Sequence, residues 1–273
     1  TQPLTLRSRH RTAYPGSMPT WDPARYLQFA DDRARPYLDL IGQIRTTADT
    51  IVDLGCGTGS VTRHLRTFWP DADILGIDSS PEMVDVALRE NCDAHLNYDI
   101  ADVATWEPFA PVDLMVSNAM FQWVPDQFTV IDRLLGFLTD GGSFAVQVPN
   151  NTDTATHTSV RELAETEPYR SHLADIRPIP AIEPEDYLEF FAERGFAVNA
   201  WSTTYRHILH GDDPVFDWIS ATGARPYLQA LDDDLRDKFT QDLKTRLRHA
   251  YPARPYGTVL PFQRTFAVAS PQA

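Results

Sequence analysis

The most informative stretch of this sequence is Val52-Asp53-Leu54-Gly55-Cys56-Gly57-Thr58-Gly59-Ser60, which completes a short apolar run and opens a segment of helical character. Three alternate glycines let the backbone turn sharply and approach a ligand closely, because no Cβ stands in the way. The helix start behind them favours negative charge. The stretch therefore predicts a buried strand, a tight turn and a helix, and it makes the turn a candidate ligand site.

Strands and helices alternate around this turn as far as about residue 150. Apolar residues at helical spacing predict a helix over residues 24–45, and short apolar runs predict strands at 51–54 and 74–78. Ser80 followed by Pro81 is typical of a helix start. Further strands are predicted at residues 95–100, 112–117 and 143–148, with helices over 60–69 and between the last two strands. This βαβα order predicts an α/β fold with a parallel sheet covered by helices on both faces.

The second half of the chain is less regular. Residues 157–194 have mainly helical character interrupted by prolines, and a strand is predicted at 198–209. Helices at 214–250 and a last strand at 258–269 follow, so about fifty residues separate the last two strands, where a hairpin needs only a few. We therefore expect one domain over residues 18–273, with a helical lid at about residues 157–194 and 212–252.

The first seventeen residues differ from the rest of the chain. They contain Arg7, Arg9 and Arg11 but no acid, and they lack the apolar core of a secretory signal. We expect residues 1–17 to form a flexible N-terminal arm. A transit peptide, or an upstream extension ahead of Met18, is the alternative.

Composition argues against several classes of partner. The chain carries 38 acids against 24 bases and a net charge of -14. Nucleic acids and anionic membranes are held by dense positive charge, so neither is expected. Two cysteines give no disulfide framework, and no apolar run approaches the roughly 18 residues needed to cross a bilayer. We expect a cytoplasmic protein, a monomer or weak homo-oligomer, that acts on a small molecule.

The spacing of the glycines bears on the ligand. A dinucleotide fingerprint has its third glycine three positions after the second, whereas Gly59 follows Gly57 after two. Asp53 in the preceding strand would repel a pyrophosphate but suits a ligand with an ammonium group. Asp78 closes the second strand, where a carboxylate can accept two hydrogen bonds from a ribose diol. A generic turn with capping acids is the alternative, and an oxidoreductase is disfavoured by the glycine spacing.

This combination resembles the nucleotide-binding motifs of class I S-adenosylmethionine-dependent methyltransferases. The glycine loop resembles the motif that contacts the methionine part of the cofactor, Asp78 the ribose-binding acid, and Asp99 with Ile100 the adenine site. The resemblance implies a Rossmann-like fold whose seven-stranded sheet is mostly parallel, with the last strand antiparallel. The cofactor-binding residues that it implies are Asp53, Gly55, Cys56, Gly57, Gly59, Asp78, Ser79, Asp99, Ile100, Asn118 and Trp123.

A narrower resemblance, to trans-aconitate 2-methyltransferases, covers roughly residues 20–270. Its most specific stretches are residues 201–205 and 217–228, which lie outside the part that the wider superfamily shares. Asn118-Ala119, Gln122-Trp123 and His157 also follow this pattern. Thr58, where a proline is common, and the divergent residues 168–185 depart from it, so the acid that this chain accepts can differ from trans-aconitate.

The implied reaction is esterification of a carboxylate of trans-aconitate, or of a close polycarboxylic acid, and it makes modest chemical demands. A carboxylate is already ionised near neutral pH, since its reference pKa is about 4, so no general base and no catalytic residue are expected. The enzyme must align the two reactants and exclude water. Such positioning can supply on the order of 7–11 kcal/mol.

An anionic substrate on an acidic protein requires cations that are concentrated at the site. Arg225 on the expected lid is the first candidate, because a guanidinium grips a carboxylate through two hydrogen bonds; a surface salt bridge is the alternative. His207 and His210 lack further ligands at metal spacing, so no metal is expected. The other candidates for substrate binding, for which core packing or structural pairing is the alternative, are Tyr26, Tyr205, Trp123, Arg264 and Arg33.

Three functions stay open on the sequence alone. The favoured one is a methyltransferase that makes the monomethyl ester of trans-aconitate or a close relative. The second is a methyltransferase for a different small acid, with the same cofactor site and a changed pocket. The third is a protein that binds the cofactor without turning it over, which is disfavoured because the resemblance extends over the lid.

Overall fold

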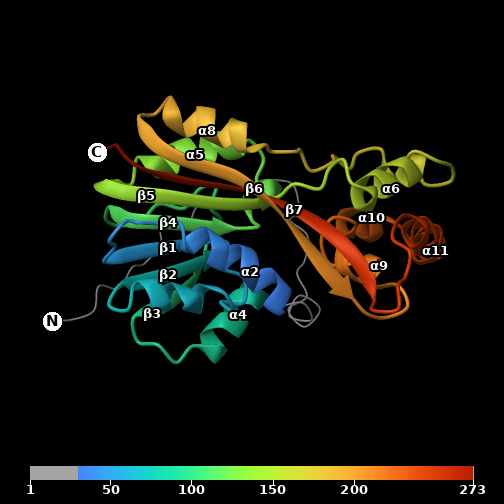
Figure 1. Ribbon diagram of the computed structural model, residues 1–273, viewed down its shortest axis with the longest axis horizontal. Helices are drawn as coiled ribbons and strands as arrows, with labels where there is room; N and C mark the ends of the chain where they lie inside the picture. Colours follow the sequence, from blue (N-terminus) through green and yellow to red (C-terminus); the bar gives the residue numbers. More distant parts are fainter. Residues whose placement is uncertain (1–29, 273) are drawn as a thin grey trace. The chain divides into compact units, whose positions relative to one another are not determined.

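Seven strands form one sheet in the computed structural model of this protein, which describes residues 30–272 (Figure 1). Their order across the sheet is β3-β2-β1-β4-β5-β7-β6. The pairs β1–β2, β1–β4, β2–β3 and β4–β5 are parallel, and the last strand is antiparallel. The predicted α/β class and the mostly parallel seven-stranded sheet are therefore confirmed. The strands are β1 (Thr50–Leu54), β2 (Asp73–Asp78), β3 (Leu96–Ile100), β4 (Val112–Asn118), β5 (Leu138–Pro149), β6 (Phe196–Leu209) and β7 (Thr258–Pro271).

The parallel strands are in register, so their carboxyl ends meet at one edge of the sheet. Leu54 at the end of β1 pairs with Ile77 of β2 and with Ser117 of β4. Asp78 pairs with Ile100 at the end of β3. In open α/β sheets, ligands bind outside this edge, where the strand order reverses direction. Here the reversal falls between β1 and β4, directly beside the glycine loop.

The two faces of the sheet bury different sets of side chains, because successive strand residues point to opposite faces. Val52 and Leu54 belong to the main apolar cluster, together with Ile131 and Leu134 of α5 (Gln127–Leu135). Asp53 lies between them in the strand and therefore faces the other way. On that face it receives hydrogen bonds from α2 (Ala30–Ile41) and from the 3-10 helix η1 (Thr62–His64).

The helix that follows β2 begins as predicted. Ser80 is the N-cap of α4 (Pro81–Glu90), and its hydroxyl accepts a hydrogen bond from the Met83 N–H. Pro81 occupies the first helical position, where its missing N–H costs nothing. The predicted helix over residues 60–69 is instead two short pieces, η1 and α3 (Leu65–Phe68).

The chain divides into two compact units. The first contains the described chain up to Val148, together with Ile182–Ser202 and Thr265–Ala273; the second contains Pro149–Ala181 and Thr203–Arg264. The single domain expected over residues 18–273 stays a prediction. Nothing in the local patterns marks the division, because β6 and β7 each continue from one unit into the other.

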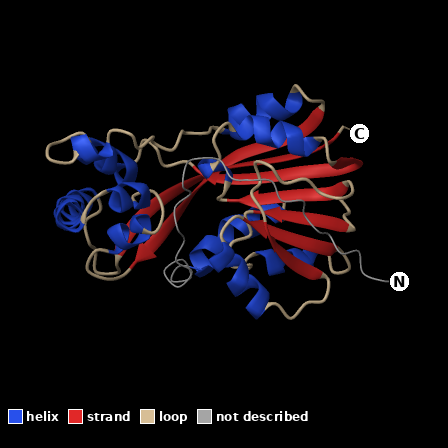
Figure 2. Cartoon of the chain, turned by 180° about the vertical axis from the view of Figure 1, so that it is seen from behind, coloured by secondary structure: helices blue, strands red, loops and turns tan. Residues whose placement is uncertain are grey.

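The second unit is mainly helical (Figure 2). Asp213, just before α9, forms ion pairs with Lys244 at 3.2 Å and Arg248 at 2.6 Å, both on α11. Tyr169 packs edge-on against Phe239 of α11, with ring centroids 5.0 Å apart. A run of three acids begins α11, and the Asp232 side chain caps the helix by accepting from the Leu235 N–H. The helices of this unit are α6 (Ala155–Ala164), α7 (Arg170–Leu173), α9 (Pro214–Ser220), α10 (Arg225–Ala230) and α11 (Asp233–Ala250).

One part of the expected lid lies elsewhere. Residues 182–194 were expected in the lid, but α8 (Pro184–Ala192) belongs to the first unit. Tyr187 and Phe191 of α8 are fully buried in the core of the sheet, and the Tyr187 hydroxyl donates to Gln127 Oε1 at 2.7 Å. The physical reason is the apolar face of α8, which the parallel strands bury. Across residues 30–272, no helix is both long and apolar enough to cross a membrane.

Candidate functional site

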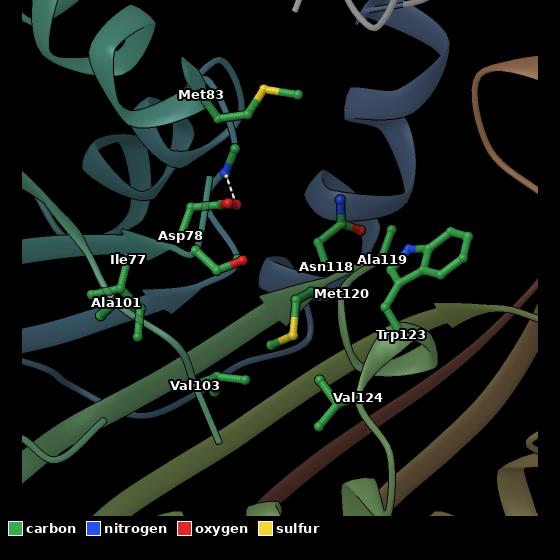
Figure 3. A pocket seen from close by; sticks show the side chains of 13 residues that line it. Ile77, Asp78, Met83, Ala101, Val103, Asn118, Ala119, Met120, Trp123 and Val124 are labelled. Atoms are coloured by element: carbon green, nitrogen blue, oxygen red, sulfur yellow. Dashed lines mark hydrogen bonds between the residues drawn. The ribbon is translucent and has the colours of Figure 1, made fainter. Parts of the chain in front are cut away.

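A pocket of about 740 Å³, including the open solvent at its mouth, lies at the carboxyl edge of the strands in the first unit (Figure 3). Small-molecule sites typically combine an apolar lining with a few polar groups. Its lining comes from the ends of β1, β2 and β4 and from the segments that follow β3 and β4. The lining residues are Gly55, Gly57, Ile77, Asp78, Ser79, Met83, Ala101, Val103, Asn118, Ala119, Met120, Trp123 and Val124.

The glycine loop is fastened to the neighbouring strand by backbone hydrogen bonds. The N–H groups of Gly55 and Cys56 donate to the Ile77 carbonyl at 2.8 and 3.0 Å. Gly55 and Gly57 both have left-handed φ, of 78° and 57°, which explains why glycine stands at each. A Cβ on Gly57 would meet nothing within 4 Å, so the loop leaves open space in front of this residue.

Asp78 sits at the centre of this side of the pocket (Figure 3). Its Oδ2 accepts from the Gly57 N–H and its Oδ1 from the Ser80 N–H, each at 2.9 Å. Burial raises the pKa of this carboxyl, and backbone N–H groups, led by that of Ser80, oppose the shift. A carboxylate oxygen can accept more than one hydrogen bond, so Asp78 can hold the loop and still accept hydroxyl donors from a ligand.

Asp53 lies outside the lining of this pocket. Its carboxylate is 1% exposed and accepts hydrogen bonds from Thr62 Oγ1 at 2.7 Å and from the Tyr37 hydroxyl at 3.3 Å. Burial raises the pKa of Asp53 to about 7, and the nearby charge of Asp78 adds to that shift. The structure therefore places this predicted cofactor ligand on the face of β1 opposite to Val52 and Leu54, where it is hydrogen-bonded to two hydroxyl groups.

The end of β4 forms the other side of the pocket. Asn118 is the last residue of the strand, and its buried Oδ1 has no partner among the described residues. Ala119 has a left-handed φ of 58°, which is unusual for a residue with a Cβ. Met120 fills the space that a Cβ on Gly55 would occupy. The two sides of the pocket thus meet through the pair Gly55 and Met120.

Four further predicted residues flank the pocket without lining it. The Cys56 side chain is buried, and its thiol lies 3.7 Å from the Gly57 carbonyl oxygen. A Cβ on Gly59 would collide with the Tyr98 hydroxyl, so this glycine makes room for a side chain of β3. Asp99 Oδ1 accepts from the Ile100 N–H at 2.9 Å, next to the lining residue Ala101. Of the eleven predicted cofactor residues, the lining contains Gly55, Gly57, Asp78, Ser79, Asn118 and Trp123.

The apolar part of the lining was not predicted. Ala101 and Val103 follow the third strand directly, and Met83 lies in the first turn of α4. Proximity to a strand end is the signal that points to them, because segments after parallel strands share one edge of the sheet. The other lining residues outside the prediction are Ile77, Met120 and Val124.

Three predicted substrate residues belong to the second unit. Tyr205 and Arg264 are buried, with exposed fractions of 2% and 5%. The Arg264 guanidinium lies 4.8 Å from the centre of the Phe262 ring. Arg225 begins α10 and is partly exposed. Trp123 lines the pocket of the first unit, and Tyr26 and residues 1–17 lie outside the described residues.

The second unit also buries histidines. His157 on α6 approaches Gly223, where an added Cβ would lie 2.8 Å from its Nε2. Burial lowers the pKa of His157 to about 4, and the charge of Arg161 adds to this shift, so the imidazole is neutral near pH 7. His207 packs against Trp218 at 4.7 Å between ring centres. Within residues 30–272, no group of three His, Cys, Asp or Glu side chains is placed to hold a metal ion.

Comparisons with known proteins place the chain in a family. The model of the methyltransferase domain matches residues 26–200. Two solved structures share the fold: a phosphoethanolamine N-methyltransferase 2 of Haemonchus contortus in complex with S-adenosylhomocysteine, and YcgJ of Bacillus subtilis. The first has a TM-score of 0.55 at 16% identity over 92% of this chain and 57% of the other. The second has a TM-score of 0.56 at 14% identity over 87% and 97%.

Sequence relatives match along nearly the whole chain. A trans-aconitate 2-methyltransferase of Streptomyces coelicolor is 44% identical over 93% of this chain and 88% of its own length. The enzyme of the same name from Streptomyces avermitilis is 44% identical over 95% and 100%. One from Mycobacterium tuberculosis is 40% identical over 91% and 96%. Identity of this extent covers both units, and the chain therefore belongs to the trans-aconitate 2-methyltransferase family.

Proposed function

We propose that this protein transfers a methyl group from S-adenosylmethionine to a carboxylate of trans-aconitate, giving a monomethyl ester. The observation that carries this proposal is identity of 40–44% to enzymes of that name over more than nine-tenths of the chain. This identity extends over the second unit, which lies largely beyond the residues that the general methyltransferase model matches.

The residues of the pocket fit this cofactor. Asp78 is an acceptor suited to the two hydroxyls of a ribose. The open space in front of Gly57 admits a ligand close to the backbone, and the orphan Asn118 Oδ1 is a further acceptor. A flat apolar ring suits the group formed by Ile77, Ala101, Val103 and Val124.

When bound, S-adenosylmethionine supplies an electrophilic methyl group on a sulfonium. The side chains of this protein have to bind, orient and exclude water, because the attacking carboxylate of the acid needs no deprotonation near neutral pH. Alignment of this kind can supply on the order of 7–11 kcal/mol. We accordingly assign no general base and no nucleophile to the chain.

We assign recognition of the acid to side chains of the second unit. Arg225 is the first choice, because a planar guanidinium can form two parallel hydrogen bonds with one carboxylate. Arg264 is a second cation, and Tyr205 offers a hydroxyl. With a net charge of -14 the protein repels an anion at long range, so binding depends on such local cations.

Mass spectrometry of purified protein with S-adenosylmethionine and a panel of di- and tricarboxylic acids tests the proposal. We expect a gain of one methyl group on trans-aconitate well above the other acids. Preference for another acid would move the substrate assignment and leave the cofactor assignment intact. Binding of the cofactor without transfer to any acid would contradict the enzymatic assignment.

The same assay tests Arg225. Replacing Arg225 with Ala should raise the KM for the acid about 10- to 100-fold, because hydrogen bonds between charged groups contribute about 1.5–3 kcal/mol. Cofactor affinity should change little. Arg206→Ala is the matched control, since Arg206 is an exposed arginine on β6 of the same unit. Equal KM values for the two variants would remove the assignment of Arg225.

A further inference from the structure

The turn that leaves β4 contains a strained residue in the wall of the pocket. Ala119 has a φ of 58°, in the left-handed region that residues with a Cβ rarely adopt. It lines the pocket between Asn118 and Met120 (Figure 3). Strained backbone of this kind persists only where the surroundings hold it, and such residues cluster at functional sites.

Two hydrogen bonds hold the Ala119 peptide groups. The Ala119 N–H donates to the Gln147 carbonyl at 2.8 Å, which continues the pairing of β4 with β5. The Ala119 carbonyl accepts from the Gln122 side-chain Nε2 at 2.6 Å. Gln122 is 8% exposed, and this bond is partly buried. Only the amide nitrogen can donate to a carbonyl, which fixes the orientation of the Gln122 amide.

This arrangement leaves the other end of the Gln122 amide unpaired. Its Oε1 is buried and has no hydrogen-bond partner among the described residues. A glutamine that only stabilised the core would be expected to satisfy both of its polar atoms. Gln122 instead uses its one directed bond on the strained residue, three positions earlier in the chain.

The conformation of Ala119 controls its neighbours in the wall. Met120 follows it and occupies the space left by the missing Cβ of Gly55, so there is little room for a different turn. Trp123 is linked to the same turn, because its N–H donates to the Met120 carbonyl at 2.9 Å. Relaxation of Ala119 to a negative φ would therefore displace several lining side chains together.

We propose that Gln122 is a positioning residue: its amide holds Ala119 in the left-handed conformation and thereby sets the β4 wall of the ligand pocket. Gln122 acts through Ala119 and does not itself line the pocket. The identity of the ligand in the following test rests on the proposed function.

Calorimetric binding of S-adenosylhomocysteine to four proteins tests this role: the unsubstituted chain, Gln122→Met, Ala119→Gly and the double variant. Methionine keeps the length of the side chain but has no donor. We expect Gln122→Met to weaken binding about tenfold, which corresponds to about 1.4 kcal/mol. Glycine adopts the left-handed region without help, so the same substitution should weaken binding less than about twofold when Ala119 is already glycine.

Gln127→Met is the matched control. Gln127 is also buried and accepts one hydrogen bond, from Tyr187, but it lies outside the lining of the pocket. We expect this variant to lower the melting temperature and to keep the ligand affinity. If Gln122→Met behaves in the same way, Gln122 is a core residue and the inference is wrong.

Two further outcomes decide the matter. An equal loss of affinity from Gln122→Met in both backgrounds would show that Gln122 does not act through Ala119, and would overturn the inference. If the unsubstituted chain binds no S-adenosylhomocysteine, the proposed function fails instead, and a crystal structure of Gln122→Met then supplies the answer. A left-handed Ala119 in that structure would overturn the inference, whereas a negative φ would support it.

Discussion

The two walls of the pocket reach the same kind of backbone conformation by different means. On the β1 side, Gly55 and Gly57 occupy the left-handed region with no side chain to obstruct it. On the β4 side, Ala119 occupies the same region with a Cβ, and the Gln122 amide donates to its carbonyl. The β1 wall depends on the absence of side-chain atoms at the two glycines, and the β4 wall depends on the hydrogen bond from the Gln122 amide.

This difference determines how each wall can fail. Added atoms break the glycine wall, because the space around Gly55 is already filled by Met120. Removal of a donor breaks the β4 wall, because nothing intrinsic to alanine favours a φ of 58°. The first wall is therefore sensitive to enlargement and the second to truncation.

The largest loss of stability should come from adding a side chain to a glycine of the β1 wall. Gly55→Ala places a Cβ on Met120 and leaves the new residue at a φ of 78°. Left-handed strain of about 1–2 kcal/mol and overpacking of about 1–3 kcal/mol together predict a loss of about 2–5 kcal/mol in the free energy of unfolding. Urea denaturation measures it.

Gly57→Ala is the control for this substitution, because Gly57 has a similar φ of 57° but open space at its Cβ. It should lose only the strain, about 1–2 kcal/mol. Equal losses for the two variants would show that Met120 moves aside easily, and that the walls are not locked together at Gly55.

A second prediction concerns the titration of Asp53, which precedes the glycine loop in β1. The folded-state pKa of Asp53, about 7, lies above its ordinary value, so the folded protein binds more protons than the unfolded chain in this range. The stability that Asp53 contributes is complete below its unfolded pKa and is lost as the pH rises through 7. Between pH 5.5 and 8.5, the free energy of unfolding of the unsubstituted chain should fall by about 2 kcal/mol because of Asp53, since it changes by 1.36 kcal/mol per unit of pH below 7. The free energy of unfolding of Asp53→Asn should not show this fall.

Chemical denaturation of Asp53→Asn and of the unsubstituted chain at both pH values checks this sign. Groups far from Asp53 titrate equally in the two proteins, so the difference between them reports on Asp53 and on its coupling to Asp78. A constant difference would mean that the Thr62 and Tyr37 hydroxyls hold Asp53 ionised throughout, at an ordinary pKa.

The smallest effect should come from loosening the bond that joins the two walls. The buried Ser117 hydroxyl donates to the Leu54 carbonyl at 2.9 Å, directly before the glycine loop. Ser117→Ala should cost about 1 kcal/mol of stability, the usual worth of one neutral hydrogen bond, and should weaken S-adenosylhomocysteine binding a few-fold.

Ser220→Ala serves as the comparison, because the Ser220 hydroxyl also donates to a backbone carbonyl, that of Asp217 at 3.0 Å, within the second unit. It should cost a similar amount of stability and leave that affinity unchanged. Loss of affinity in both variants would mean that the Ser117 bond has no special connection to the pocket.

The same contrast explains what the sequence predicts well. Glycines predict a left-handed turn, and Ser80 followed by Pro81 predicts a helix start. The glycine side of the pocket and the order of the strands therefore follow from local patterns. An alanine at φ 58° carries no such signal, because its conformation comes from a glutamine that folding brings alongside it.

Three further features depend on how the elements pack around a residue or a segment. Asp53, whose role as a cofactor ligand stays a prediction, lies outside the pocket lining, because alternation along β1 turns it away from the face that buries Val52 and Leu54. The apolar stripe of α8 predicts a buried helix without saying which core receives it, and it packs on the sheet. The separation of the second unit is similarly a property of packing, since both of its segments continue strands or loops of the first.

The route of the chain through its two units constrains how the protein can be altered. The chain passes between them four times, after Val148, Ala181, Ser202 and Arg264, and three of these passages lie inside continuous strands. The second unit therefore has no single connection to the first. A protease cannot release it with one cut, and it cannot be exchanged as one continuous segment. Under the proposed assignment of acid recognition to the second unit, a change of acid specificity requires substitution of individual residues or simultaneous exchange of two segments, with the strands that carry them retained.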